Sequence, residues 1–267
     1  MKLELLRNCV HGSEIATYLA TDEFGERRVA KTSTTLSGIK NLLNEVEGWR
    51  WYQELRHQSN DPICWIAQQK VKYLQIYIKY IDGYTPVYQN GLMRNADSIR
   101  KIVQHYCQTW PRSSDWTPMH GDLSLDNVII NGDDVHIIDW EHFTAASAPW
   151  GFDIMYLLFV SLYFGMYSGK HQRHKPTRQE TQIICEHINT IINHHQLHSE
   201  MLKAPLRFIR EYISAHHDSW GAQLSSFPMK LPIIAFSSEQ VTMIDEMIMA
   251  GLAQTHLLRS QHYQEAP

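Results

Sequence analysis

Short runs of alternating apolar and polar residues dominate the first third of the chain. Five of them are rich in β-branched or aromatic residues and are separated by turn residues, a pattern typical of β-strands. In the last run, Leu74, Ile76 and Ile78 alternate with other side chains, so one face of that strand should be buried. The predicted strands span residues 3–10, 14–21, 27–33, 62–69 and 72–80. Together they predict an antiparallel sheet.

Most of the remaining chain follows the period of a helix. Ser37 can cap a helix that runs to about residue 56, with Leu42, Val46 and Trp49 spaced as i, i+4 and i+7. Further helices are predicted from Asn95 or Asp97 to residue 109, from near residue 150 through the apolar stretch 154–167, and at about 178–196, 200–217 and 238–260. We therefore predict an α+β fold, in which a five-stranded antiparallel sheet with one helix precedes a mainly helical part.

Residues 119–143 carry polar side chains that packing alone does not explain. The stretch begins with a loop bearing His120, Asp122 and Asn127 and continues as two short apolar runs joined through an Asn-Gly step. Such a pair of runs predicts a β-hairpin. The hairpin would hold Asp139, at the end of its second strand, close to the loop. The two strands are predicted at residues 127–130 and 135–138.

These residue types suit phosphoryl transfer. That reaction needs one carboxylate for the acceptor hydroxyl and oxygen ligands for Mg2+. Asp122 would be the carboxylate, and Asn127 and Asp139 would be the ligands. The alternative is that Asp and Asn only cap a turn, but turn chemistry explains neither His120 beside Gly121 and Asp122 nor a carboxylate at a strand end.

Composition excludes several classes of protein. A chain of 267 residues, 43% of them hydrophobic, can form one large domain or two lobes. Its formal net charge of -4 argues against a protein that binds nucleic acid or a membrane surface. The first ten residues lack a signal-peptide core, and residues 154–167 fall short of the ~20 needed to span a bilayer. The cysteines show no metal-binding or disulfide spacing, so we expect a cytoplasmic location.

The pattern His-x-Asp-x-x-x-x-Asn, followed after a hairpin by Ile-Asp, resembles the catalytic and metal loops of the protein-kinase-like superfamily. His-Gly-Asp-Leu-Ser at 120–124 and Ile-Asp-Trp-Glu at 138–141 are most similar to the aminoglycoside phosphotransferase and choline kinase family. The resemblance implies a two-lobed protein-kinase-like fold with ATP as phosphate donor. We expect the boundary near Gly83, which gives a nucleotide-binding N-lobe at 1–82 and a C-lobe at 83–267.

In this family the N-lobe holds the nucleotide. The resemblance implies that Lys31 binds the α- and β-phosphates and that an ion pair with Glu45 orients it. Glu45 lies beside the apolar stripe of its helix, whereas Glu47 faces elsewhere, so we prefer Glu45. The resemblance also implies a turn over the phosphates, here with one glycine, and a hinge that reads adenine through its backbone. These positions are Gly12 and Ser13 in the turn, and Tyr80 and Ile81 in the hinge.

Residues beyond Asp139 are candidates for the acceptor side. They are Glu141, Trp150 and Asp153, of which Asp153 matches a family aspartate that commonly supports the catalytic loop. Gly121 stands where a regulated protein kinase has an arginine, and the linker after Asp139 is too short for a peptide-docking segment. Both departures favour a small-molecule kinase over a regulated protein kinase.

We therefore expect an enzyme that uses ATP and Mg2+ to phosphorylate a hydroxyl of a small molecule, such as choline, ethanolamine, a sugar or an aminoglycoside. Asp122, Asn127 and His120 would form the catalytic loop. Two alternatives stay open: an atypical protein kinase, and a nucleotide-binding pseudokinase that acts as an interaction module. The glycine-poor turn favours the pseudokinase, whereas the presence of Lys31 and Asp139 disfavours it. The oligomeric state does not follow from the sequence.

Overall fold

A computed structural model describes residues 2–7, 14–56, 62–112, 116–167, 172–215 and 232–264. Gly12 and Ser13, the predicted phosphate turn, lie outside these residues, as do residues 8–10 of the first predicted strand.

The first part of the chain forms one antiparallel sheet with the strand order β1-β2-β3-β5-β4. The predicted five-stranded sheet is therefore confirmed, with strand ends that differ from the predictions by about two residues. Leu74, Ile76 and Ile78 alternate into the core as expected. The strands are β1 (Lys2–Arg7), β2 (Ala16–Thr21), β3 (Arg27–Ser33), β4 (Cys64–Lys70) and β5 (Tyr73–Lys79).

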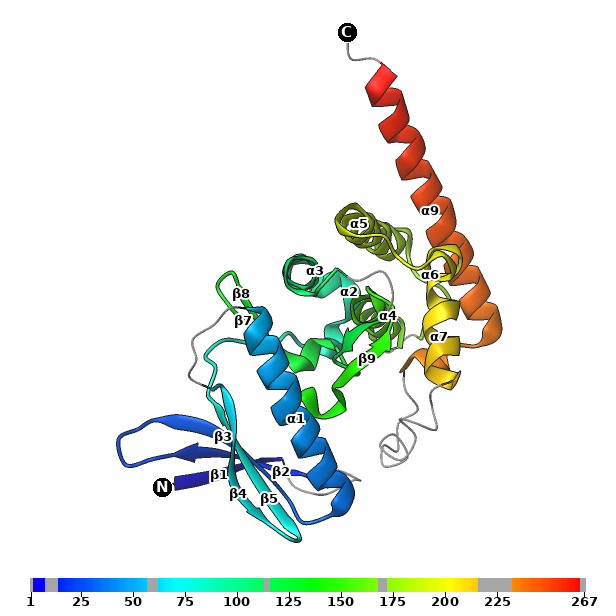
Figure 1. Cartoon of the computed structure of the whole chain (residues 1–267). Helices are drawn as coiled ribbons and strands as arrows, with labels where there is room; N and C mark the ends of the chain where they lie inside the picture. Colours follow the sequence, from blue (N-terminus) through cyan, green and yellow to red (C-terminus); the bar gives the residue numbers. More distant parts are fainter. Residues whose placement is uncertain are drawn as a thin grey trace.

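Helix α1 (Leu36–Leu55) lies between the sheet and the rest of the molecule (Figure 1). Its cap is Thr35 rather than the predicted Ser37. Thr35 has the extended backbone of a cap, and its side chain accepts a hydrogen bond from the Gly38 amide at 3.2 Å. Ser37 already lies inside the helix, and its hydroxyl donates to the carboxylate of Glu14.

The predicted hairpin is formed by β7 (Val128–Asn131) and β8 (Asp134–Ile137), which pair antiparallel. The first strand begins one residue later than predicted, because Asn127 ends a 3-10 turn, η2 (Leu125–Asn127). After Asp139 the chain makes a second 3-10 turn, η3 (Trp140–His142). It then forms β9 (Thr144–Ala148), which pairs with β6 (Thr117–Met119). This pairing was not predicted, since strands of three and five residues carry little periodicity.

The second part of the chain is helical, as predicted. The predicted helix at 200–217 is instead two helices, because Pro205 lacks the backbone N–H that a continuous helix needs and begins a new one. Asn95 precedes its helix but its side chain binds the carbonyls of Val87 and Gly91 rather than capping. The helices are η1 (Tyr88–Asn90), α2 (Gly91–Arg94), α3 (Ala96–Thr109), α4 (Phe152–Tyr167), α5 (Arg178–His194), α6 (Ser199–Lys203), α7 (Pro205–Ala215), η4 (Pro232–Ala235) and α9 (Ser238–Gln264).

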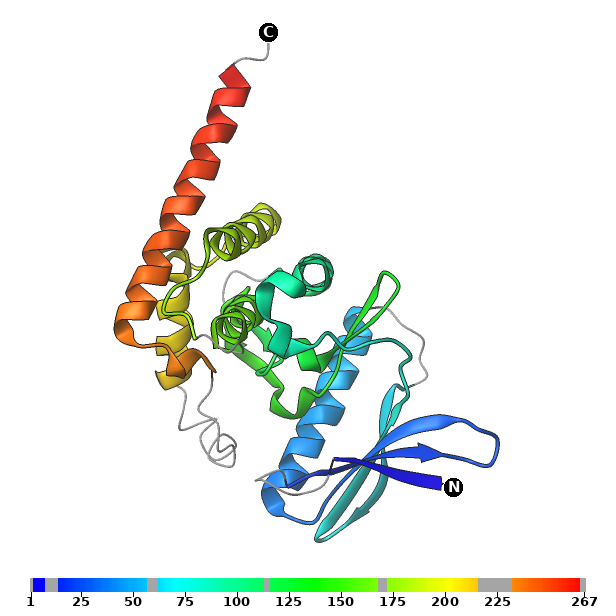
Figure 2. The ribbon, with the colours of Figure 1, turned by 180° about the vertical axis from the view of Figure 1, so that it is seen from behind.

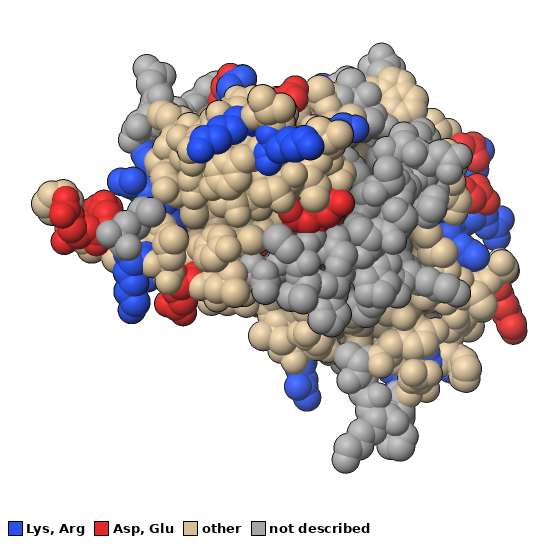
Figure 3. Space-filling model, turned by 90° about the horizontal axis from the view of Figure 1, so that it is seen from below, with Lys and Arg blue, Asp and Glu red and all other residues tan. Residues whose placement is uncertain are grey.

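The apolar stretch predicted as a buried helix is α4, which is buried around its whole circumference from Phe152 to Leu162. Its neighbours α2, α5 and α7 pack against it, α9 packs on α5 and α7, and the last turns of α9 project beyond the other elements (Figures 1 and 2). No helix in the described ranges is long and apolar enough to cross a bilayer. On the face seen in Figure 3, blue and red side chains are interspersed among uncharged residues.

Candidate active site

A cleft of about 340 Å³ lies between the sheet and the hairpin of β7 and β8. Its apolar lining includes Ile15, Val29, Ile78 and Ile129, and its polar lining includes several of the predicted site residues. An apolar slot with a few convergent polar groups is typical of a small-ligand site. The candidate residues along the cleft are Lys31, Glu45, Tyr80, Ile81, Asn127, Asp139 and Glu141.

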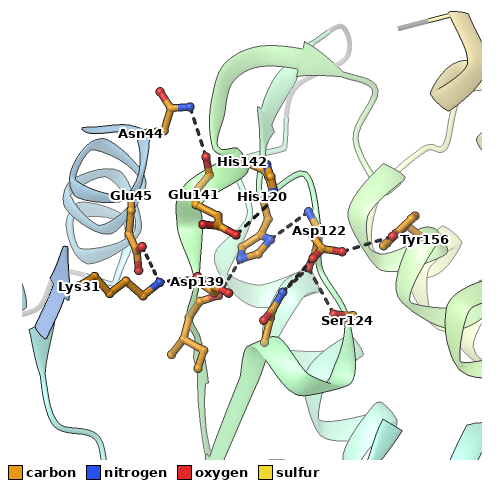
Figure 4. A network of polar contacts seen from close by, with 12 residues as sticks. Lys31, Asn44, Glu45, His120, Asp122, Ser124, Asp139, Glu141, His142 and Tyr156 are labelled. Carbon is orange, nitrogen blue, oxygen red and sulfur yellow. Dashed lines mark hydrogen bonds and ion pairs between the residues drawn. The ribbon is translucent and has the colours of Figure 1, made fainter. Parts of the chain in front are cut away.

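Lys31 reaches from β3 to carboxylates on two other elements (Figure 4). Its Nζ lies 2.6 Å from Oε2 of Glu45 on α1, and it also forms an ion pair with Asp139 after β8. Burial opposes the charge of Lys31, but Asp139 and Glu45 raise its pKa above the ordinary value. Burial raises the pKa of Glu45, and Lys31 opposes that rise. Glu47, the rejected alternative, is exposed.

Asp139 has a strained backbone. Its φ of 64° and ψ of 57° put it in the left-handed region, and it is the only described residue other than glycine with a positive φ. Such a conformation costs about 1–3 kcal/mol and persists only where the surroundings impose it. Ile138 supplies that constraint, since its N–H donates to Asn127 O at 2.9 Å and its carbonyl accepts from His120 Nε2 at 2.8 Å.

His120 connects the two halves of the site. It is fully buried, and burial lowers its pKa to about 4, so the ring is neutral near pH 7. With a proton on Nε2, the ring donates to Ile138 O, while Nδ1 accepts from the Asp122 amide at 3.2 Å. Both nitrogens are therefore engaged, which ties the loop to the strand that leads into Asp139.

Asp122 is joined to this network by the hydrogen bond from its amide to His120. Its Oδ2 accepts from Asn127 Nδ2 at 3.3 Å, and its Oδ1 accepts from the Tyr156 hydroxyl at 3.3 Å. Burial raises its pKa to about 7, an effect that His142 opposes and that Asp126 reinforces. A carboxylate whose pKa lies near neutral pH suits a general base. Tyr156 was not among the site residues predicted from the sequence, and the structure adds it through this contact with Asp122.

Asp153 supports the loop from below. Its carboxylate accepts from the backbone amides of His120, at 2.8 Å, and of Gly121, at 3.2 Å. Burial raises the pKa of Asp153 to about 7, and these two hydrogen bonds oppose the rise. Gly121 has a φ of +87°, and a Cβ there would stand 2.6 Å from the carbonyl oxygen of His142. Only glycine fits at this position.

The acceptor-side candidates divide into two groups. Glu141 lies on the cleft, whereas Trp150 and Asp153 are each only 2% exposed and lie in the core. Trp150 packs on the rings of Tyr106 and His195. Trp150 and Asp153 therefore face the core rather than the cleft, because the start of α4 is packed inside the helical part.

The hinge segment borders the cleft on its other side. Tyr80 and Ile81 line the cleft, and the Arg27 guanidinium lies 3.9 Å from the centre of the Tyr80 ring. Arg27 also forms an ion pair with Asp82 at 2.8 Å. The hinge is thus attached to the start of β3, the strand that carries Lys31.

The donors suit a magnesium ion that is bound mainly by phosphate. Asn127 and Asp139 offer oxygen ligands, and Ile138 joins them through the hydrogen bond to Asn127 O. Within the described ranges, no three His, Cys, Asp or Glu side chains come close enough to hold a metal ion by themselves. Mg2+ in nucleotide sites commonly takes one or two protein ligands and completes its shell with phosphate and water.

Residues 50–174 match the Phosphotransferase enzyme family. The family resemblance noted from the sequence is thereby confirmed for the segment from His120 to Asp139. Lys31 and Glu45 lie before the matched residues. The evidence that they belong to the site is therefore the ion pair that they form. No match was found among curated proteins.

Solved structures that resemble this chain include the following two. One is the amicoumacin kinase hAmiN in complex with AMP-PNP, Ca2+ and Ami, with 11% identity over 95% of this chain and 88% of that chain and a TM-score of 0.48. The other is the streptomycin-ATP-APH(2")-IIa ternary complex, with 10% identity over 90% of this chain and 93% of that chain and a TM-score of 0.44.

Proposed function

We propose that the protein transfers a phosphoryl group from ATP, with Mg2+, to a hydroxyl of a small molecule. The observation that carries this proposal is that Lys31, Asn127 and Asp139 line one cleft, and that Asn127 donates a hydrogen bond to the carboxylate of Asp122. These groups come from β3, from the catalytic loop and from the end of the hairpin. The family match covers the loop and the hairpin.

Each residue has a role that follows from its charge and position. Lys31 would bind the α- and β-phosphates, with Glu45 orienting its ammonium group. Asn127 and Asp139 would bind Mg2+, which supplies charge neutralisation on the phosphate oxygens when bound. Asp122 would accept the proton of the acceptor hydroxyl as its oxygen attacks the γ-phosphorus, and ADP would leave.

The remaining candidates would position these groups. His120 would hold the loop against Ile138, and Asp153 would hold the backbone of the same loop from the core. Glu141, on the cleft, would lie towards the acceptor, for which an amino alcohol, a sugar or an aminoglycoside suits a carboxylate. Tyr80 and Ile81 would border the adenine.

We further propose that the two lobes divide at residues 82 and 83. Gly83 supports this boundary, because its φ of +145° and the closeness of Ile130 O, 2.6 Å from a Cβ placed there, require glycine. Beyond it, Tyr84 forms an antiparallel bridge with Ile130 of the hairpin. A donor such as ATP is consistent with a cytoplasmic location.

The test is ADP release with ATP and Mg2+ across choline, ethanolamine, amino sugars, aminoglycosides, sugars and a generic protein substrate. We expect one small alcohol to stimulate release in the wild type but not in Asp122→Ala. Stimulation by the protein substrate alone would indicate an atypical protein kinase. Bound nucleotide with no stimulation by any acceptor would indicate a pseudokinase.

A further inference from the structure

A stripe of three side chains on α1 faces the segment that leads into Asp139. Glu45, Trp49 and Tyr52 follow one another at i, i+4 and i+7, the spacing of a single helix face, and Arg56 continues the stripe just after the last turn of the helix. Glu45 pairs with Lys31 at one end of the stripe, and Arg56 Nη1 lies 2.9 Å from His136 Nδ1 of β8 at the other. The stripe therefore links the ion pair to the strand that leads into Asp139.

Tyr52 inserts its hydroxyl into the backbone of β8. The ring is 1% exposed, and the hydroxyl oxygen lies 3.3 Å from both Ile137 N and Val135 O, and 2.6 Å from His105 Nε2. Burial lowers the pKa of His105 to about 3, so its ring is neutral. With a proton on Nε2, both His105 and the Ile137 amide donate to the hydroxyl, which donates to Val135 O. Every hydrogen-bonding position of the hydroxyl is then used.

The same helix face also contacts the chain after Asp139. A Cβ on Gly48 would stand 2.6 Å from Cβ of Trp140, so the missing side chain lets α1 approach η3 closely. Asn44 Nδ2 donates to the backbone oxygen of Glu141 at 3.3 Å. The helix is thus fixed to the chain on both sides of Asp139.

Glu45 has few contacts of its own to hold the helix. Its Oε2 pairs with Lys31, but its Oε1 is buried and has no hydrogen-bond partner among the described residues. The desolvation cost of a buried ion pair offsets most of its attraction, so the pair with Lys31 does little to hold α1 in place. Other contacts of α1 must keep Glu45 opposite Lys31.

We propose that Tyr52 is a positioning residue that fastens α1 to β8 and so sets the geometry of Lys31, Glu45 and Asp139. The inference rests on the proposed function, since its consequence is a nucleotide and magnesium site assembled before any ligand binds. Outward movement of α1 would break the hydroxyl contacts and the close approach at Gly48 together.

The test compares Tyr52→Phe with Tyr167→Phe. The first removes the hydroxyl at β8. The second removes a hydroxyl that accepts from Gln240 Nε2 at 2.7 Å, in the helical part. We measure hydrogen exchange of the Ile137 amide and the Mg2+ concentration at half-maximal binding of a non-hydrolysable ATP analogue. We expect Tyr52→Phe to raise both the exchange rate and the half-maximal Mg2+ concentration, the latter about tenfold, and Tyr167→Phe to change neither.

His105 supplies a second variant in case Tyr52→Phe does not fold. His105→Leu removes one donor to the hydroxyl and should shift the Mg2+ dependence in the same direction but less. His105→Gln keeps an N–H donor and should restore it. A purely structural role would lower the melting temperature without moving the Mg2+ dependence.

Two results would overturn the inference, and they are distinguishable. If Tyr52→Phe and His105→Leu bind the analogue with the Mg2+ dependence of the wild type, Tyr52 is not a positioning residue although the proposed function stands. If the wild type neither binds the analogue nor turns over ATP with any acceptor, the proposed function fails, and this inference fails with it.

Discussion

Replacing Gly121 by alanine should disrupt the catalytic loop far more than the fold. The matched control is Gly132→Ala in the turn of the hairpin. Both glycines have a positive φ, +87° and +61°, but a Cβ on Gly132 meets nothing within 4 Å, whereas a Cβ on Gly121 meets His142 O at 2.6 Å. Comparing the two variants therefore separates the cost of the strained backbone from the cost of the steric clash.

The expected loss of unfolding free energy is the sum of these two costs. A left-handed backbone costs an alanine roughly 1–2 kcal/mol at either position. The collision at Gly121 adds about 1–3 kcal/mol of overpacking, because the contact is with a backbone atom that cannot swing aside. Gly132→Ala should thus lose about 1–2 kcal/mol of unfolding free energy, and Gly121→Ala about 2–5 kcal/mol.

The collision also displaces the catalytic loop. Relief requires His120 and Asp122 to move relative to Asp153, whose carboxylate accepts from both His120 and Gly121 amides. A shift of about 1 Å in a positioned group can reduce turnover about 100-fold. Denaturant unfolding measures the first effect, and ADP release with the best acceptor measures the second. Equal losses of stability and of turnover in both variants would refute the reasoning.

Three further predictions concern the reacting groups. Asp122→Ala should abolish turnover but leave the affinity for ATP and Mg2+ within about twofold, measured by calorimetry, because Asp122 acts on the acceptor; wild-type turnover would contradict the assignment of the loop. Asp139→Ala should raise the half-maximal Mg2+ concentration for nucleotide binding at least tenfold, and an unchanged value would exclude it as a ligand. Because burial raises the pKa of Asp122 to about 7, the base is protonated below that value and kcat/KM should rise with pH through about 7; a rate already constant from pH 5 to 8 would contradict a general base with that pKa.

Local patterns were sufficient for the catalytic hairpin and for the choice of Glu45 in the ion pair. The hairpin follows from two apolar runs and one Asn-Gly step, and Glu45 follows from its place beside the apolar stripe of α1. The hairpin depends on neighbours within a few residues, whereas the ion pair was implied by the family resemblance, and periodicity served only to choose Glu45 over Glu47. The cap of α1 was misplaced by two residues, because Thr35 and Ser37 are both good caps and only the backbone conformation distinguishes them.

Such local patterns could not predict contacts between segments that are distant in the chain. The packing of Trp150 on Tyr106, the pairing of β6 with β9 and the contact of the Tyr156 hydroxyl with Asp122 each join residues that are 25 or more positions apart. The sequence identifies which residues have suitable chemistry, but the packing decides whether their side chains face the cleft or the core. Asp153 illustrates the difference, since it has the chemistry of a ligand and the position of a support.

The sequence alone determined the α+β class and the family of the segment from His120 to Asp139, and it predicted the reacting groups, because these depend on residue type and short spacing. Tertiary structure decided the rest. It brought Lys31, Asp122 and Asp139 together from three elements, imposed a left-handed backbone on Asp139 and placed the Tyr52 hydroxyl in β8. Those outcomes depend on the close packing of α1 against the catalytic segment, in which each position is fixed by contacts that lie far away in the chain.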